Sequence, residues 1–302
     1  MLLATRHDDE LEAALADPEA ADRAEIRLAV VMTGGVSLAV WIGGVVAEIY
    51  RAHKRVGLYK PLLDALRSDV TIDIVTGASA GGLNGVFLGA ALSRQVDVEQ
   101  FDGLRDVWLT AGSMIALLRD PYQRNPPSLL KGDAYLLVEI EKVLRGWLKW
   151  GKNQFKAGQQ FDLVLTATTL APDIVQRADD LGARIAEPVH RARFHFQASH
   201  FNAPAPDTLA RQMALAARTS ASFPGAFEPS YVGIGRDSAY ADMAGIASFP
   251  QSMWAMDGGV LMNKPVAPAL DLLRDRRSVR HGRRILLYVN PDPSDGAVTQ
   301  EA

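Results

Sequence analysis

The chain of 302 residues contains no cysteine. Disulfides, thiolate metal sites and cysteine nucleophiles are therefore excluded together, and nothing points to an oxidising compartment. An excess of positive charge is also absent, because 32 Lys and Arg stand against 35 Asp and Glu and leave a net charge of −3. Nucleic-acid binding through bulk charge is excluded on that ground, and we expect no nucleic-acid partner.

The N-terminal region lacks the pattern of a secretory signal peptide. Acidic residues are spread over positions 1–27, whereas a signal peptide begins with basic residues and continues into an apolar stretch. We predict an acidic leader over residues 1–25, one main domain over 26–290, and a polar tail over 291–302, where a longer polypeptide could have been truncated. A cytoplasmic location is expected, with peripheral contact at the inner membrane surface as a weaker alternative.

Two segments of 20 residues, Leu28–Ala47 and Ile74–Ser93, carry no formal charge. Their length is sufficient to cross the hydrocarbon core of a bilayer. Each contains several glycines, however, and changes from a short β-branched run to helical character. This pattern is typical of a buried strand, a tight glycine turn and a buried helix. We therefore predict a strand–turn–helix unit in each segment.

Two such units predict a parallel sheet. Residues 96–160 are helical in pattern and form an insertion, which either covers the sheet as a helical layer or serves as a lid. The sequence therefore predicts an α/β protein with three α/β/α layers, a mostly parallel central sheet and a helical insertion. The predicted strands are Ile26–Met32, Val70–Thr76, Phe161–Thr169, Ala192–Ser199 and Arg284–Asn290.

The residues Gly77-Ala-Ser-Ala-Gly81 lie between the second predicted strand and the predicted helix Leu83–Leu92. Glycines two positions before and after Ser79 let the chain turn sharply enough to hold the serine hydroxyl above the sheet. The N–H groups of a helix N-terminus favour negative charge that develops there. The pattern predicts Ser79 as a nucleophile, with Gly77 and Gly81 in its turn. A glycine turn that binds phosphate is the alternative.

A serine hydroxyl needs a base to become a nucleophile, and two residues are candidates. His281 lies late in the chain, as the common hydrolase order of serine, acid and histidine requires, but its Arg-rich surroundings are typical of a solvated surface. Asp257 follows an apolar run and precedes two glycines. A dry environment would raise the pKa of its carboxyl group, as a carboxylate base requires. Spacing alone does not choose between them.

Three motifs follow one another along the chain: Thr33-Gly-Gly35, Gly77-Ala-Ser-Ala-Gly81 and Asp257-Gly-Gly259. Together with the segment Ala217–Pro229, they resemble the patatin-like phospholipase family, and the resemblance spans roughly residues 26–290. It implies a three-layer α/β/α fold and hydrolysis of lipid acyl esters by a Ser–Asp dyad without histidine. Ser79 would then be the nucleophile and Asp257 the base, with no metal and no cofactor.

The early glycine loop resembles the oxyanion loop of that family, with one departure. The family pattern Gly-Gly-Gly-x-Arg/Lys-Gly aligns with Gly34, Gly35 and Val36 at its three glycines and with Leu38 at its basic position. A backbone N–H does not depend on its side chain, so these three residues are expected to form the oxyanion hole. The missing cation at Leu38 predicts a preference for neutral esters, slow turnover or the use of another cation.

The predicted partner is a lipid or ester substrate, with a membrane surface as the place of contact, and the sequence does not predict an oligomeric state. Two alternatives stay open. The first is an esterase with a Ser79–Asp257–His281 triad. The second is a catalytically weak lipid-binding or regulatory module, for which Leu38 is the main argument.

Overall fold

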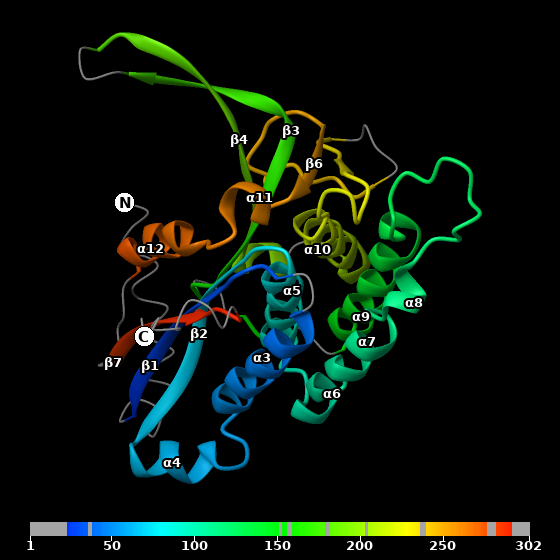
Figure 1. The fold of residues 1–302 in the computed structure, drawn as a ribbon. Coiled ribbons are helices and arrows are strands. Elements are labelled where there is room, and N and C mark those ends of the chain that lie inside the picture. The colour runs from blue at the N-terminus through cyan, green and yellow to red at the C-terminus, as the bar shows by residue number, and fades with distance from the viewer. Residues whose placement is uncertain are drawn as a thin grey trace, which may run out of the picture.

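A computed structural model describes residues 23–35, 38–150, 153–155, 159–178, 182–202, 205–235, 240–276 and 282–291. Its centre is a seven-stranded sheet (Figure 1), in which the pairing runs in the order β5-β6-β3-β2-β1-β7 and β4 also pairs with β3. The strands are β1 (Ala24–Met32), β2 (Ser68–Gly77), β3 (Asp162–Ala178), β4 (Arg184–Gln197), β5 (Ser230–Val232), β6 (Met253–Asp257) and β7 (Gly282–Val289).

Strand directions divide the sheet into two parts. β1 pairs in parallel with β2 and β7, and β2 pairs in parallel with β3. β4 and β6 run antiparallel to β3, and β5 runs antiparallel to β6. β3, β2, β1 and β7 are thus parallel, with β7 at one edge of the sheet, and the antiparallel strands β4, β5 and β6 all lie on the β3 side.

Helices cover both faces of the sheet (Figure 1), which confirms the predicted three-layer α/β/α fold. Val30 and Met32 of β1 lie in the main core, beneath the larger group of helices, whereas Ala29 and Val31 meet α12 on the opposite face. This alternation is the two-residue period of a strand. The main-core helices are α3 (Ala39–His53), α5 (Ala80–Arg94), α9 (Leu137–Leu148) and α10 (Pro206–Ser220), and α12 spans Val266–Arg274.

Shorter helical segments complete the layers. They are α4 (Tyr59–Ala65), α6 (Val98–Asp102), α7 (Leu104–Thr110), α8 (Met114–Leu117), the π-helical turn η1 (Gly132–Leu136), the 3-10 turn η2 (Ala198–Phe201) and α11 (Gly259–Met262).

The predicted insertion is a helical layer, one of the two alternatives from the sequence. Trp108 of α7 and Trp147 of α9 are buried and pack edge-on against Phe87 of α5, with ring centroids 5.9 and 5.7 Å apart. Edge-to-face contacts at such distances add to the stability gained from burial. The insertion therefore contributes to the main core.

Both uncharged segments form the predicted strand–turn–helix units. The first runs from β1 into α3, and the second runs from β2 into α5. Every residue of α5 is buried, so its apolar character serves packing inside the protein. Within the part of the chain that the structure describes, no helix combines the length and the apolar character needed to cross a bilayer.

Two parts of the sheet differ from the prediction. β3 and β4 continue past the predicted ends, Thr169 and Ala192, into a two-stranded ribbon that projects from the body of the molecule (Figure 1). Side chains on both faces of this ribbon, such as Ile174 and Ile185, are exposed, so the one-sided alternation that reveals a half-buried strand is missing. The short strands β5 and β6 were also not predicted.

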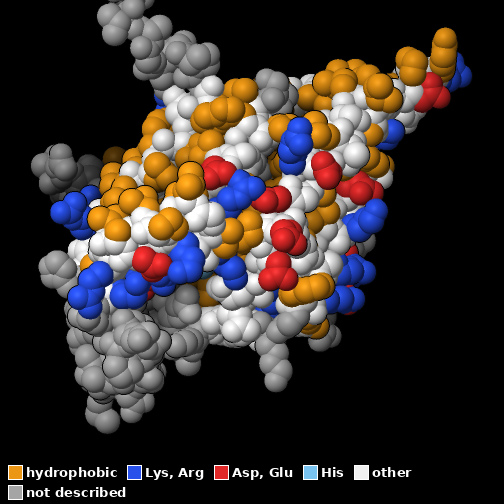
Figure 2. Space-filling view, turned by 90° about the horizontal axis from the view of Figure 1, so that it is seen from below, with side chains coloured by type: hydrophobic (Ala, Val, Ile, Leu, Met, Phe, Trp, Pro, Cys, Tyr) orange, Lys and Arg blue, Asp and Glu red, His pale blue; other side chains and the backbone are white. Residues whose placement is uncertain are grey.

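Charges of both signs are spread over the face that is seen from below (Figure 2). Seen from below, acidic and basic side chains lie close together, and hydrophobic side chains gather on the side where α4 lies (Figure 2). Leu58, Leu62 and Leu66 in and around α4 are among the exposed apolar residues. The face shows no large patch of a single charge, in agreement with the small net charge of the sequence.

Candidate active site

Ser79 occupies the turn between β2 and α5, where its backbone takes a conformation that is rare for a residue with a side chain. Its φ and ψ angles are 50° and −119°. Positive φ at a non-glycine residue is strained and persists only where the surrounding structure enforces it. Here the chain passes so closely that a Cβ on Gly77 would lie 2.5 Å from Gly81 C, and one on Gly81 would lie 2.5 Å from Met32 O. Only glycine fits these two positions.

Asp257 reaches Ser79 because β2 and β6 lie on the same side of β3. Leu165 of β3 pairs with β2, and Ala167, two residues further, pairs with Asp257 at the end of β6. Both of these β3 residues also pair with β4, which therefore occupies the opposite side. The turn that follows β2 thus faces the end of β6. Ser79 Oγ donates a hydrogen bond of 2.8 Å to Asp257 Oδ2.

The environment of Asp257 suits a carboxylate base. Its side chain is 1% exposed, and its second oxygen, Oδ1, accepts the N–H of Gly259 at 2.6 Å. Burial raises the pKa of Asp257 to about 6, against the lowering effect of the hydrogen bonds from Ser79 and Gly259. The carboxyl group is therefore mostly ionised at neutral pH, yet a stronger base than an exposed aspartate.

Residues at the C-terminal end of α10 and just after it bind the backbones of both Ser79 and Asp257. Ser220 Oγ accepts the N–H of Ser79 at 3.1 Å, and the carbonyl oxygen of Ser220 accepts the N–H of Gly258 at 3.2 Å. The carbonyl oxygen of Ser222 accepts the N–H of Asp257 at 3.1 Å. Ser220 and Ser222 are fully buried. The serine turn and the end of β6 are therefore fixed to one another through a third element.

A buried arginine underlies this end of α10. The guanidinium of Arg218 has no exposed surface, donates to Ser222 Oγ, and donates to the carbonyl oxygen of Glu228 at 2.9 Å. Carboxylate oxygens of Asp133 and Glu228 lie 3.3 and 3.4 Å from it. Although burial opposes it, hydrogen bonds from Ser128 and the Asp133 N–H hold the pKa of Glu228 down to about 2. The buried cation therefore lies between two carboxyl groups, as a buried charge requires.

The early glycine loop lies against Ser79. A Cβ on Gly34 would stand 2.9 Å from Ser79 Cβ, and it would also collide with the side-chain oxygen of Asn263. The N–H of Gly34 donates to Asn263 Oδ1 at 3.0 Å and to the carbonyl oxygen of Asn263 at 3.4 Å. This predicted oxyanion donor is therefore occupied by a residue that follows α11.

The rest of the predicted oxyanion loop is only partly described. The carbonyl oxygen of Gly35 accepts the N–H of Leu38 at 3.2 Å, and the N–H of Gly35 has no acceptor among the described residues. Leu38 is half-buried, and its side chain lies against Gly35. Val36, the third predicted donor, lies outside the described residues.

Histidine has no contact with Ser79 among the described residues. His281, the alternative base, lies outside them. The four described side chains with a ring-nitrogen contact bond elsewhere: His53 to Val70, His190 to Thr169, His195 to Asp162 and His200 to Gln197. In the described ranges, no group of three or more His, Asp or Glu side chains is placed to hold a metal ion.

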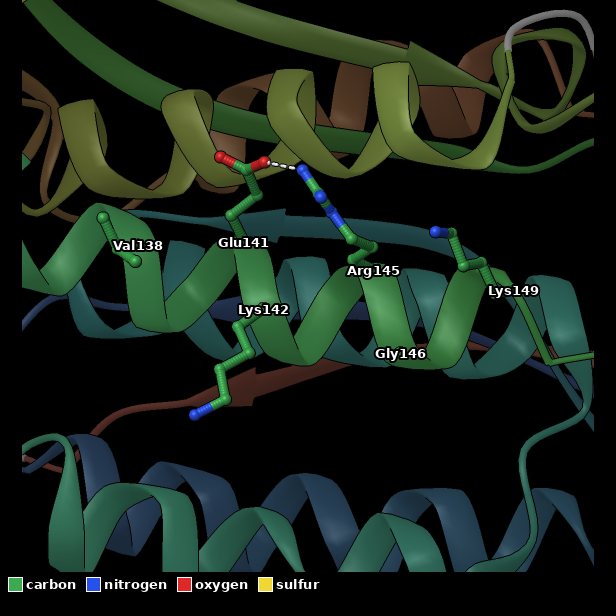
Figure 3. A pocket seen from close by; sticks show the side chains of 6 residues that line it. All are labelled: Val138, Glu141, Lys142, Arg145, Gly146 and Lys149. Carbon is green, nitrogen blue, oxygen red and sulfur yellow. Dashed lines mark hydrogen bonds and ion pairs between the residues drawn. The ribbon is translucent and has the colours of Figure 1, made fainter.

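A cavity of about 540 Å³ lies along α9 and is built by side chains of that helix. Glu141 and Arg145 form an ion pair on the side facing α10, whereas Lys142 points the opposite way (Figure 3). Arg145 and Lys149 also pair with Asp207 of α10, at 3.2 and 3.0 Å. Because these cations are matched within the protein, the cavity shows no built anion site.

Two residues at the site were not singled out from the sequence. Ser220 lies in the segment Ala217–Pro229, which carried part of the resemblance, but no pattern assigned it a contact with Ser79. Asn263 is a lone asparagine between α11 and Pro265, and its type and spacing give no signal. Both act through contacts between elements far apart in the chain.

The fold and this site define a class: three-layer α/β/α proteins with a serine on a strained strand–helix turn and an acid at the end of a neighbouring strand. A family model described as patatin-like phospholipase matches residues 30–270, and the chain belongs to that family. Membership supports a lipid acyl hydrolase at the level of the family.

A relative from Mycobacterium tuberculosis (strain ATCC 25618 / H37Rv) is 35% identical over 304 residues and is named only as an uncharacterized membrane protein. The match covers 88% of this chain and 27% of the relative. The chain therefore spans about a quarter of the length of that protein.

Proposed function

We propose that this protein hydrolyses lipid acyl esters through a dyad of Ser79 and Asp257. The observation that carries the proposal is the direct hydrogen bond of 2.8 Å from Ser79 Oγ to Asp257 Oδ2, at a strained turn beneath a helix N-terminus. The carboxylate contacts the hydroxyl itself and leaves no place for a histidine between them. A dyad is therefore favoured over the triad with His281.

The reaction would follow from this geometry in two halves. Asp257 takes the proton of Ser79 as the hydroxyl oxygen attacks the ester carbonyl, and the proton then passes to the leaving alcohol, which departs as an acyl-enzyme forms. Asp257 next takes a proton from water as the water oxygen attacks the acyl group, and it returns this proton to Ser79 Oγ as the bond to the acyl group breaks and the fatty acid is released. Among the described residues of the glycine loop, the N–H of Gly35 has no acceptor and is therefore available to donate to the oxyanion.

A lipid substrate is supported by exposed apolar residues that lie close in sequence to the residues of the site. Phe223 follows directly on Ser222, and Val260 and Leu261 follow on Gly259; these three large apolar residues are between 43 and 47% exposed. Exposed apolar groups near a site suit contact with an apolar ligand or a membrane surface. Leu38 in place of a cation leads us to propose neutral acyl esters as the preferred substrates. Contact with a membrane and a cytoplasmic location stay predictions.

Hydrolysis of a short p-nitrophenyl ester and of a fluorogenic phospholipid tests the proposal. Wild type, Ser79→Ala, Asp257→Asn and His281→Ala would be compared after their folding has been checked. We expect Ser79→Ala and Asp257→Asn to lose at least about a thousandfold in kcat, and His281→Ala to keep wild-type activity. Loss of activity in His281→Ala would instead establish the triad.

The same assay distinguishes the enzyme from a binding module. A folded wild type that hydrolyses neither substrate, and whose serine does not react with a fluorophosphonate, would contradict the proposal. The fold would then serve lipid binding or regulation, as the departure at Leu38 allows.

A further inference from the structure

We propose that Asn263 is a positioning residue that sets the oxyanion loop of this enzyme. Its side-chain and main-chain oxygens both face the N–H of Gly34, at 3.0 and 3.4 Å. An N–H donates only to an acceptor, so the carboxamide oxygen is the atom that faces the loop. The inference rests on the proposed function and adds to it a residue that neither the motifs nor the family pattern singled out.

Asn263 stands between the two halves of the site. The point where a Cβ on Gly259 would lie is 2.8 Å from Asp257 Oδ1 and 3.0 Å from Asn263 Oδ1. The point where a Cβ on Gly34 would lie is 2.9 Å from Ser79 Cβ and is overlapped by the same asparagine oxygen. The carboxamide therefore reaches both the glycine loop and the surroundings of the dyad.

The contact between Asn263 and Gly34 determines which backbone N–H of the glycine loop can donate to the oxyanion. With its N–H held by Asn263, Gly34 cannot stabilise an oxyanion, whereas the N–H of the next residue, Gly35, has no acceptor among the described residues. An oxyanion donor works only when it is held in place before charge develops, because any reorganisation adds to the barrier. Asn263 thus fixes the loop at Gly34 so that Gly35 can serve the transition state.

Fold stability depends little on this contact. Asn263 is exposed and Gly34 is half-buried, so water can replace the lost bond in a variant. A change at Asn263 should therefore lower turnover without unfolding the protein. That separation makes the proposal testable.

Three substitutions test it: Asn263→Ala, Asn263→Asp and the control Asn153→Ala. Asn153 also uses its carboxamide in a hydrogen bond, to Asn202, outside the active site. For each variant, kcat and KM for the p-nitrophenyl ester would be measured between pH 5 and 9, together with the melting temperature. Wild type and Ser79→Ala complete the set.

We expect Asn263→Ala to lower kcat about ten- to a hundredfold with little change in KM, since an interaction made in the transition state is lost. Asn263→Asp keeps an acceptor for Gly34 but brings a second carboxylate close to Asp257. Like charges disfavour ionisation, so the acid limb of the pH profile should move up by about one unit in this variant. The limb should not move in Asn263→Ala, and Asn153→Ala should match wild type.

Wild-type kcat in Asn263→Ala would overturn the inference and leave the proposed function intact. If Asn263→Ala does not fold, Asn263→Ser decides, because its shorter side chain no longer brings an acceptor to the position of Asn263 Oδ1: wild-type kcat overturns the inference, and a lowered kcat with unchanged KM supports it. A folded wild type without activity on either substrate, equal to Ser79→Ala, overturns the proposed function and the inference together.

Discussion

The two sides of the candidate site are built in different ways. On the α10 side, Ser220, Ser222 and Arg218 are fully buried, and hydrogen bonds from that side hold the backbones of both members of the dyad. On the loop side, Gly34 is half-buried and is held by Asn263, which is exposed. The same reaction thus depends on one interior support and one surface support.

This difference indicates on which side of the site a substitution should affect stability and activity together. A buried polar contact is part of the folding energy, because its loss leaves a desolvated group without a partner. A surface contact can be replaced by water at small cost. Changes on the α10 side should therefore reduce stability and activity together, whereas changes on the loop side should reduce activity alone. The Asn263 variants test the loop side, and four predictions test the α10 side and the dyad.

Removal of Arg218 should have the largest effect on stability. Arg218→Met removes the buried cation between the carboxylates of Asp133 and Glu228, and breaking a buried ion pair costs about 3–5 kcal/mol. Glu228 keeps its ion pair with Arg119 at 3.1 Å, so we expect a loss near the lower end of that range. Urea unfolding measures the loss. Activity should fall with it, because the guanidinium also donates to Ser222, which holds Asp257.

Arg94→Met is the matched control for Arg218. Arg94 is buried and donates to the carbonyl oxygen of Leu148 at 2.9 Å, away from the dyad. The Arg94→Met variant should be less stable than wild type, but its folded fraction should keep the wild-type kcat. If Arg218→Met proves too unstable to study, Arg218→Lys keeps the charge and should lose both stability and kcat, with smaller losses. An Arg218 variant with wild-type stability and reduced activity would break the contrast.

At Asp257 the requirements of stability and activity conflict, because the ionised carboxylate that catalysis needs destabilises the fold. The pKa of about 6 in the folded protein lies above the ordinary value of 3.8, so ionisation of the carboxyl group destabilises the fold. This cost is complete above about pH 6 and absent below about pH 4. Asp257→Asn should therefore raise the free energy of unfolding by about 1–3 kcal/mol at pH 8 while abolishing turnover. Equal stability of both proteins at every pH would contradict the assignment.

Much of this architecture could be predicted from the sequence. The strand–turn–helix units were evident because buried parallel strands are short β-branched runs that end in glycine turns. The ribbon of β3 and β4 was missed because its side chains are exposed on both faces. The strands β5 and β6 have three and five residues, too few to show a period, although β6 carries Asp257 to the site.

The candidate site was predictable only in part, for a similar reason. Ser79 and Asp257 lie in local motifs, and the glycines beside them are required by close backbone approach. Ser220 meets Ser79 across 141 residues, and no local pattern records such a contact. The role of Asn263 likewise depends on which N–H of the loop its oxygen reaches. The roles of all these residues stay predictions until activity is measured.

The pH dependence of activity tests the interior side without a mutation. Asp257 acts as a base only when ionised, so kcat/KM should fall about tenfold for each pH unit below about 6 and level off above it. A pH profile of the wild type on the p-nitrophenyl ester measures the midpoint, with enzyme pre-incubated at each pH and returned to pH 7 as a check for unfolding. A midpoint near 4 would show that the carboxylate is not held in a dry site.

Ser220→Ala should give the smallest effect. The buried N–H of Ser79 loses its acceptor, which costs about 1–3 kcal/mol of stability. The turn then holds Ser79 less firmly in its strained conformation, and we expect kcat to fall about tenfold. Ser93→Ala is the matched control: Ser93 is fully buried, and its hydroxyl donates to Ala90 at the far end of α5. Similar stability losses with a rate loss only in Ser220→Ala would show that α10 positions the serine. Equal rates in Ser220→Ala and Ser93→Ala would show that the Ser220 hydroxyl contributes to folding and not to the positioning of Ser79.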